Sequence, residues 1–407
     1  MNPDLFTYQP ESPLQECTNG LMADRQILIQ PDLSVRDWLT DAGCQALTGF
    51  HAVMDATTIS RLKSAGACLV GSTRMAELGL GINGGTMAEA LSAGHGDLGL
   101  VTDLLGEARI FALLAGWFGF KPSFGLVSRF GLVGLVPSME CTGFLSQTPG
   151  DIAQALATVA GPDENDFSMA TTPLPDINHA ALSEHTPNRI GIPRQLKQHL
   201  SASARKGFAD CLEHAAKGGF EVVELDLPGF DHFAAVHQVI AAAEASSSCG
   251  KYDGVRYGFR AEDARNWNHM YLQSRSRGFG PRLKSFLFQG AYFQFENYPA
   301  FENACALRRK LISRLNSAFK SVDLLALPAR LPNAAPDGAD TMAETYAAFG
   351  LTLPANLAGL PALCLPGIIR DGGIDLGLQL FGPHMTDARV LAGGLKINAC
   401  IKGDATE

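Results

Sequence analysis

The chain of 407 residues lacks the long apolar runs that cross membranes. A membrane-spanning helix needs about 18 or more consecutive apolar residues, and no segment reaches that length. The first residues, MNPDLFTYQPESPLQECTNG, also lack the basic stretch and apolar block of a secretory signal. We therefore expect a cytoplasmic protein with no membrane association.

Positive charge and closely spaced cysteines are also scarce. The 32 Lys and Arg residues are outnumbered by 41 Asp and Glu, and the formal net charge is −9. Nucleic-acid-binding domains are ordinarily basic, so we expect no direct contact with nucleic acid. The nine cysteines show no C-x-x-C spacing, which favours reduced thiols, with Cys44 and Cys68 as inert buried groups. We expect neither a metal site nor a cofactor.

The chain does contain a regular alternation of helical and strand patterns. Residues 25–35 indicate a short buried strand that ends at Pro31, and residues 55–73 indicate a helix, capped by Asp55, followed by a strand. Similar units continue toward the C-terminus. This pattern predicts an α/β fold with a largely parallel or mixed sheet covered by helices.

The predicted domain organisation is simple. Residues 1–24, which contain several Pro, Ser and Asn residues, indicate an irregular N-terminal lead-in. No low-complexity linker or internal repeat interrupts the remainder. We therefore predict a single domain over residues 25–407.

Long segments of this chain resemble the amidase signature family, and within it the A subunit of the bacterial Glu-tRNA(Gln)/Asp-tRNA(Asn) amidotransferase. The resemblance runs from Leu28 to Leu395, and its segments include DATTISRLKSAGACLVGSTRMAELGLG, GFKPSFGLVSRFGLVGLVPSME, AEASSSCGKYDGVRYGFRAEDA, SRSRGFG and LPANLAGLPALCLPG. It implies the amidase signature fold, an α/β fold with a central mixed sheet flanked by helices on both faces. It also implies a Ser–cis-Ser–Lys triad, in which lysine deprotonates the nucleophilic serine through the bridging serine. Backbone N–H groups then stabilise the oxyanion.

The positions that the resemblance assigns to this triad hold other residues. Counting without gaps from matched segments places the family's lysine on Gln30, its nucleophile on Glu107 and its bridging serine on Asn83. Thr86 is the alternative for the bridging hydroxyl, because roughly twenty family residues are missing just before this turn. A glutamine amide cannot act as a general base near neutral pH. The resemblance therefore implies that the triad is lost.

The glutamine-binding positions of the family also differ here. An arginine and an aspartate that grip the substrate in the family correspond to Phe286 and Phe349. With Leu104 and Leu105, these rings predict an apolar substrate pocket. A carboxyl group at Glu107 in such surroundings should have a raised pKa, which suits a general acid or base. The alternative is that Glu107 pairs with a cation or amide and plugs the former site.

Other residues near this region are expected to shape it. Asp103 and Arg109 keep their family positions and should hold the loop in shape by ionic hydrogen bonds, and Gly106 also keeps its family position. Tyr257, in the segment YDGVRYG, lies where the family packs near the site entrance, and packing or ligand contact are both open. His95 is expected at a helix end rather than in the site.

Three functions follow from these residues. The first is a repurposed enzyme that performs acid–base chemistry on a partly apolar small molecule with Glu107. The second is a non-catalytic pseudo-amidase subunit or regulator that binds a protein partner, with a homo-oligomer also open. The third is an amidase or glutaminase with a non-serine mechanism, in which Glu107 attacks as a carboxylate.

Overall fold

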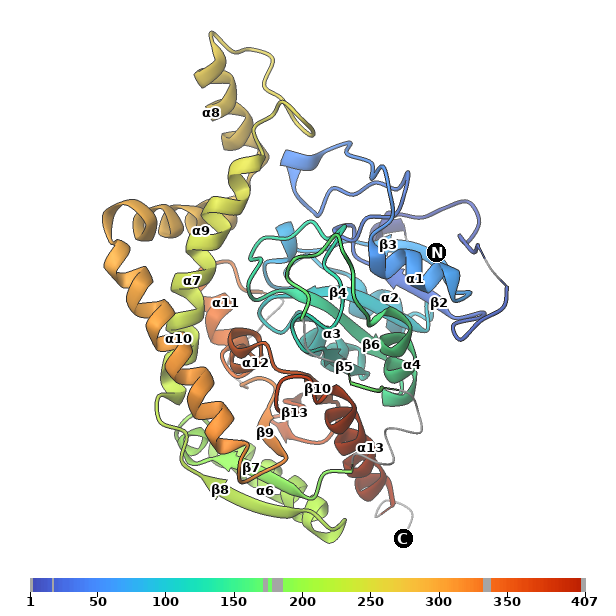
Figure 1. Ribbon diagram of the computed structural model, residues 1–407, viewed down its shortest axis with the longest axis vertical. Helices are drawn as coiled ribbons and strands as arrows, with labels where there is room; N and C mark the ends of the chain where they lie inside the picture. The colour runs from blue at the N-terminus through green and yellow to red at the C-terminus, as the bar shows by residue number, and fades with distance from the viewer. Residues whose placement is uncertain (1–2, 17, 171–174, 178–185, 332–337, 404–407) are drawn as a thin grey trace.

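A computed structural model describes residues 3–403, apart from residues 17, 171–174, 178–185 and 332–337 (Figure 1). All but two of the strands in this part of the chain join one mixed sheet. Every helix described here is too short or too polar to cross a bilayer.

The large sheet has eleven strands in the order β1-β3-β2-β4-β6-β5-β10-β13-β9-β7-β8. Their bounds are β1 (Phe6–Tyr8), β2 (Gln26–Ile29), β3 (Cys68–Thr73), β4 (Leu98–Asp103), β5 (Phe118–Lys121), β6 (Cys141–Ser146), β7 (Arg189–Pro193), β8 (Glu221–Leu225), β9 (Leu324–Pro328), β10 (Ala362–Leu365) and β13 (Leu378–Phe381). A separate two-stranded ribbon pairs β11 (Arg370–Asp371) with β12 (Ile374–Asp375).

The sheet mixes strand directions, as the sequence predicted. At one end, β2 runs parallel to β3 and β4, and at the other β7 runs parallel to β8 and β9. The strands between these groups pair antiparallel, from β4 through β6, β5, β10 and β13 to β9. Most of these central strands are apolar along their length because helices cover both faces.

The α-helices carry most of the remaining chain. Their bounds are α1 (Thr57–Ser64), α2 (Met87–Ser92), α3 (Glu107–Ala115), α4 (Pro149–Val159), α6 (Ala202–Lys217), α7 (Phe233–Ser248), α8 (Trp267–Gly278), α9 (Pro281–Ala291), α10 (Tyr298–Ala318), α11 (Met342–Phe349), α12 (Leu353–Ala358) and α13 (Asp387–Gly403). The short helices are η1 (Pro3–Leu5), η2 (Gln45–Leu47), η3 (Glu77–Gly79), η4 (Arg194–Gln198), η5 (Phe230–His232), η6 (Cys249–Lys251) and the π-helical turn η7 (Tyr292–Glu296).

Two layers of helices sandwich the sheet. Helix α3 packs on β4, β5, β6 and β10, with α2 beside it. Helix α13 packs on the other face, because Leu363 of β10 points toward Gly394 while the neighbouring Cys364 points toward Leu113 of α3. Helices α4 and α1 continue this second layer. The predicted flanking of the sheet on both faces is therefore confirmed.

Two local expectations need correction. Within residues 1–24, Phe6–Tyr8 form the edge strand β1, which pairs antiparallel with β3, so the lead-in is not irregular throughout. Alternating residues of this short strand pack against the core, which the surrounding polar residues concealed. Asp55 does not cap α1, because the N-cap residue is Ala56. The Asp55 carboxylate instead accepts a hydrogen bond from the backbone amide of Arg36 at 2.7 Å and forms an ion pair with Lys63.

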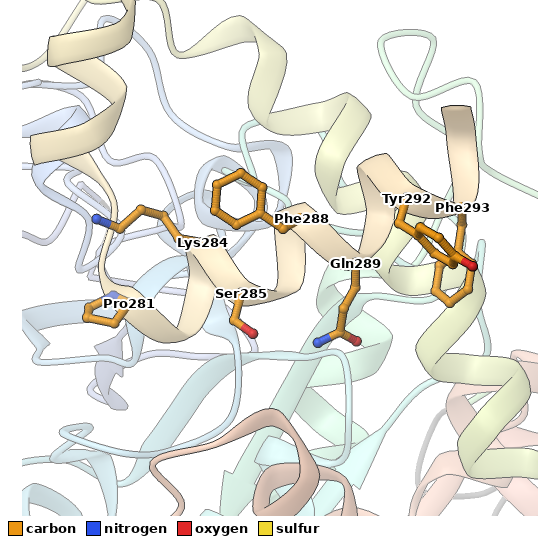
Figure 2. A pocket seen from close by; sticks show the side chains of 7 residues that line it. All are labelled: Pro281, Lys284, Ser285, Phe288, Gln289, Tyr292 and Phe293. Carbon is orange, nitrogen blue, oxygen red and sulfur yellow. The ribbon is translucent and has the colours of Figure 1, made fainter. Parts of the chain in front are cut away.

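Helices α7, α9 and α10 pack together at one side of the sheet, and α8 continues from them as a projecting arm (Figure 1). The inner face of α9 is buried, whereas a row of side chains on its other face points outward (Figure 2). On this second face Pro281, Ser285 and Phe288 are exposed, whereas Lys284 and Gln289 are half-buried.

Candidate functional site

The turn between β4 and α3 forms the centre of the candidate site. It consists of Leu104, Leu105 and Gly106, and it leads directly into Glu107 at the first position of α3. Gly106 has φ 131° and ψ 21°, a conformation that residues with a Cβ rarely adopt. An added Cβ would also collide with the side chain of Thr352. The turn therefore requires glycine for both its backbone conformation and its packing.

The Glu107 carboxylate is bound by four backbone amides. Its Oε2 accepts hydrogen bonds from the N–H groups of Leu104 and Leu105, both at 2.7 Å, and of Gly106 at 3.0 Å. Its Oε1 accepts from the N–H of Gly81 at 3.0 Å. Successive N–H groups that converge in this way make an anion-binding concavity. Here the anion is the protein's own side chain, which is 1% exposed.

The ionisation of Glu107 reflects opposing influences. Burial raises the pKa of this carboxyl group, and the nearby Asp103 carboxylate raises it further. The amides of Leu105 and Leu104 oppose both, because they stabilise the charged form. The raised pKa agrees with the expectation from sequence, and the pairing with amides agrees with the alternative in which Glu107 plugs the site.

A buried ion pair supports the same turn. Arg109 Nη2 lies 3.0 Å from Asp103 Oδ1, and both side chains are 0% exposed. Asp103 also accepts from the amide of Ala108 at 3.2 Å, and Arg109 donates to the carbonyl of Thr352 at 2.9 Å. Arg109 further binds the side chains of Gln379 and Asn356. These two residues therefore hold the turn against α12 and β13, in the shaping role that the sequence suggested.

His237 on α7 contacts the turn and was not anticipated from sequence. Its Nε2 donates to the carbonyl of Leu104 at 3.2 Å, and its Nδ1 accepts from the hydroxyl of Tyr346 at 2.9 Å. Burial lowers the pKa of His237 to about 3, so it stays neutral and keeps this tautomer. The sequence feature that could have indicated this residue is a histidine within the largely apolar stretch AAVHQVIAAA.

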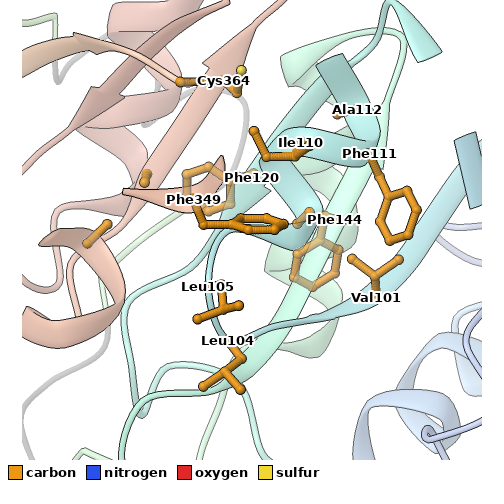
Figure 3. Packing of buried hydrophobic residues seen from close by; sticks show 14 of the residues in the cluster. Val101, Leu104, Leu105, Ile110, Phe111, Ala112, Phe120, Phe144, Phe349 and Cys364 are labelled. Atoms are coloured by element: carbon orange, nitrogen blue, oxygen red, sulfur yellow. The ribbon is translucent and has the colours of Figure 1, made fainter. Parts of the chain in front are cut away.

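The apolar side chains predicted to line a pocket are packed in the core. Phe286 and Phe349 are 0% exposed, Leu105 is 0% exposed and Leu104 is 1% exposed. Figure 3 shows Leu104, Leu105 and Phe349 within a cluster of other buried apolar side chains. Since all four side chains are covered, a ligand that contacts them must first displace part of this packing.

The other two residues that the resemblance aligned with the triad form separate contacts. Gln30 is 2% exposed, and its Oε1 accepts from the amide of Thr102 at 3.0 Å. Asn83 donates from its Nδ2 to the carbonyl of Ala339 at 3.5 Å. Neither of these bonds reaches Glu107.

Thr86, the alternative for the bridging hydroxyl, binds the N-terminal segment. Its Oγ1 donates to the carbonyl of Leu5 and accepts from the amide of Arg74 at 3.1 Å. Both contacts connect the start of α2 to the edge of the sheet.

A cation lies beside the glycine turn that contributes Gly81. Arg282 on α9 donates from Nη2 to the carbonyl of Leu80 at 2.9 Å and from Nη1 to the carbonyl of Ala339 at 3.0 Å. Burial lowers the pKa of this guanidinium, and the carboxylates of Glu77, Asp340 and Glu107, in decreasing order of effect, oppose that lowering. The site is thus less apolar than the phenyl rings alone suggested.

Asp32 is a second buried carboxyl group that sequence reasoning missed. It is 0% exposed, and its Oδ2 accepts a hydrogen bond from the Thr102 hydroxyl. Within the described part of the chain, its Oδ1 has no hydrogen-bond partner. Burial raises the pKa of Asp32 to about 7, with the Glu140 carboxylate adding to this effect and the Thr102 bond opposing it.

The aromatic and histidine candidates lie in packing contacts. Tyr257 packs against Phe50 and Tyr252, with ring centroids 5.6 and 6.0 Å apart, and its hydroxyl lies 3.4 Å from the carbonyl of Lys251. His95 packs edge-on against the ring of Phe6, 5.4 Å between centroids. These contacts account for both residues in terms of structure.

The cysteines for which the structure gives positions are free thiols. Cys44 is buried and donates to Glu77 Oε1 at 3.3 Å. Cys68 is half-buried, which corrects the expectation that it is fully buried. Among the described residues, no group of three or more His, Cys, Asp or Glu side chains is arranged to hold a metal ion.

The mixed sheet, its two helical layers and the strand–glycine turn–helix unit define an amidase-type α/β protein. The amidase family model matches residues 26–89 and 84–391, and the chain belongs to this family.

Relatives and solved structures agree with this assignment. The chain is 30% identical over 415 residues to the A subunit of glutamyl-tRNA(Gln) amidotransferase from Haloarcula marismortui, covering 95% of this chain and 98% of the relative. It is 33% identical over 400 residues to the corresponding protein of Lacticaseibacillus paracasei, covering 91% and 82%. The solved A subunit of this amidotransferase from Thermotoga maritima superposes with a TM-score of 0.80 at 24% identity, covering 98% and 88%. The peptide amidase of Stenotrophomonas maltophilia superposes with a TM-score of 0.75 at 22% identity, covering 93% and 83%.

Proposed function

We propose that this chain is a pseudo-amidase, which keeps the amidase fold, has lost serine-based hydrolysis and acts in the cytoplasm by binding a protein partner. The observation that carries the proposal is the binding of the Glu107 carboxylate by the amides of Leu104, Leu105, Gly106 and Gly81. In the serine mechanism, N–H groups of such a loop stabilise the developing oxyanion. A tethered carboxylate that takes these donors competes with any oxyanion.

The charge of Glu107 adds to this argument. A tetrahedral intermediate carries negative charge, and in a site as enclosed as this one a neighbouring carboxylate would repel it strongly. The side chain at position 107 has no hydroxyl to attack a carbonyl carbon, and Gln30 offers no basic group. The arrangement therefore favours neither the nucleophile nor the intermediate of amide hydrolysis.

The proposed partner is a protein because of what the relatives are named. The curated relatives are subunits of an amidotransferase. One structural neighbour, with a TM-score of 0.78 and 22% identity, is described as part of a vestigial protein complex that reveals the origins of an s-triazine catabolic enzyme. A family member without its catalytic groups retains the capacity of the fold to assemble with another chain.

A repurposed acid–base enzyme is the second candidate. Two buried carboxyl groups favour it, since the pKa of Glu107 is raised and that of Asp32 is raised to about 7. Groups of this kind suit general acid–base catalysis on a partly apolar small molecule. This function requires that Phe286 or Phe349 move to admit the substrate.

Native mass spectrometry of the protein purified gently from its own cells tests the proposal. The expected result is a stoichiometric complex with a second protein and no retained small molecule. A retained small molecule that is lost in a Glu107→Gln variant would instead support the repurposed enzyme.

An amide assay tests the loss of hydrolysis separately. Ammonia release from glutamine, asparagine and simple aromatic amides should be equally absent from the wild-type protein and from Glu107→Ala. Release by the wild type that disappears in Glu107→Ala would contradict the proposal and revive a non-serine amidase.

A further inference from the structure

The outward face of α9 has the pattern of a helix surface that packs against another helix. Its residues recur at three- and four-residue spacing and line a groove of about 740 Å³: Pro281, Lys284, Ser285, Phe288, Gln289, Tyr292 and Phe293 (Figure 2). We call this set the outer α9 face. A second groove of about 250 Å³ shares Lys284 and Phe288 and extends toward Leu272 of α8. Such spacing ordinarily places apolar residues against a partner.

Most of the large exposed aromatic side chains lie in the segment from the start of α8 to the start of α10. Among the described residues, five of the six lie between positions 267 and 298. They are Trp267, Phe288, Tyr292, Phe295 and Tyr298, with exposed fractions of 60%, 73%, 51%, 80% and 51%. Phe288 and Tyr292 line the same groove, and exposed aromatic residues that share a groove indicate an interaction site, whereas single exposed apolar residues are ordinary.

The opposite face of α9 is already occupied. Leu283, Phe286, Leu287 and Gly290 are buried against the rest of the protein. A helix with apolar residues on both faces is normally covered on both. The outer α9 face is therefore a surface without its partner.

The charge of the arm differs from that of the whole chain. Residues 264–295 contain five Arg and Lys residues and no Asp or Glu, while the chain carries a net charge of −9. Arg275 and Arg282 donate to backbone carbonyls of the protein itself. Arg265, Arg277 and Lys284 form no salt bridge within the described ranges, although Lys284 also donates to the carbonyl of Ser276 at 3.0 Å and acts on the Glu77 carboxylate from a distance. None of the three is neutralised by a direct ion pair, so each can pair with an external anion.

We infer that the outer α9 face binds an amphipathic helix of a partner protein, with apolar residues that cover Phe288 and Tyr292 and carboxylates that pair with Lys284 and Arg277. The inference rests on the proposed partner-binding function and specifies its surface. A second copy of this chain is disfavoured as the partner, because docking through the same face would bring like charges together. An anionic bilayer fits this surface less well, because it is flat and because its phosphates would meet the carboxylates of Glu262, Asp263 and Glu296, which flank residues 264–295.

Two synthetic helical peptides of about three heptads test the charge and the shape together. Both carry Leu at positions a and d; one carries Glu and the other Lys at the remaining positions. The Glu peptide should bind the full-length protein at least about tenfold more tightly than the Lys peptide, measured by calorimetry at moderate salt. Equal binding of the two peptides, or binding of neither, would overturn the inference.

Variants locate the binding. Phe288→Ser combined with Tyr292→Ser should abolish binding of the Glu peptide, while Phe167→Ser, which changes a fully exposed phenylalanine elsewhere, should leave it unchanged. Lys284→Glu should weaken binding of the Glu peptide and strengthen binding of the Lys peptide. Lys206→Glu, at an exposed position on α6, is the matched control and should change neither. Circular dichroism of each variant verifies that it is folded.

Other occupants give distinct outcomes. Binding to vesicles of phosphatidylserine and phosphatidylcholine that the double variant abolishes would replace the helix with a membrane. Concentration-dependent dimerisation that the double variant abolishes would replace it with a second copy. A native protein complex that persists in the double variant would refute this surface and leave the proposed function standing. Peptide binding at this face together with amide hydrolysis by the wild-type protein would support the surface and refute the proposed function.

Discussion

The Glu107 carboxylate accepts a hydrogen bond from the amide of Gly81, 26 positions earlier in the chain, at 3.0 Å. The other oxygen of the same carboxylate binds the turn that precedes α3. One side chain therefore ties together the two glycine-containing turns. It fills a place suited to an external anion with a carboxyl group of the protein itself.

Replacing this carboxylate with an amide should destabilise the protein. In Glu107→Gln, a side-chain NH2 meets backbone donors that have no other acceptor, and we expect a loss of about 2–3 kcal/mol in the free energy of unfolding. Urea unfolding measures it. Glu89→Gln on the exposed side of α2 is the matched control and should change stability by less than about 0.5 kcal/mol. Equal stability of the two variants would show that the carboxylate is not held by the amides.

The Gly106 turn should tolerate no side chain. Gly106→Ala combines an unfavourable positive φ with a collision against Thr352, and we expect a loss of about 3 kcal/mol or more. Gly84→Ala shares a positive φ of 77° but has no neighbouring atoms within 4 Å of the added Cβ, so it should cost about 1 kcal/mol. The difference between their unfolding free energies isolates the collision. If the two variants lose the same amount, Thr352 does not restrict the turn.

The buried Asp103–Arg109 pair should be sensitive to a change that keeps the charge. Arg109→Lys retains the cation but cannot reach Thr352, Gln379 and Asn356 simultaneously, and we expect a loss of about 3–5 kcal/mol. Arg256→Lys alters an exposed pair with Asp253 and should cost less than about 1 kcal/mol. Both values come from denaturant unfolding. A small loss in Arg109→Lys would mean that charge alone supports the turn.

Asp32 should make stability depend on pH. Because its pKa rises from 3.8 to about 7 on folding, the folded state binds more protons than the unfolded state between these values. The stability it contributes is fully present below about pH 4 and is lost as pH rises through about 7. The slope is at most about 1.4 kcal/mol per pH unit.

Unfolding free energies measured from pH 5 to 8 check this expectation. Asp32→Asn removes the titration and should flatten the profile relative to the wild type. Asp210→Asn, at an exposed position on α6, should leave the slope unchanged. Parallel profiles for the wild type and Asp32→Asn would contradict a raised pKa. Glu107 contributes with the same sign, so the difference between proteins is the decisive quantity.

Much of the fold was predictable because its elements are encoded locally. The apolar run before Pro31 indicated β2, and the pattern of residues 55–73 indicated α1 and β3. The resemblance extended this to the sheet and both helical layers. The central strands β5 and β6 were not identified, because their residues carry small and mixed side chains whose burial comes from neighbouring strands.

The sequence by itself determined the residue types at the positions that the resemblance aligns with the triad, and the excess of Arg and Lys over residues 264–295. Only the tertiary structure decided what Glu107 does. Its partner Gly81 is 26 positions away, and His237 reaches Leu104 across 133 positions. Hydrogen bonds over such separations depend on how strands and helices pack, which local periodicity does not report. The same packing covered one face of α9 and left the other exposed.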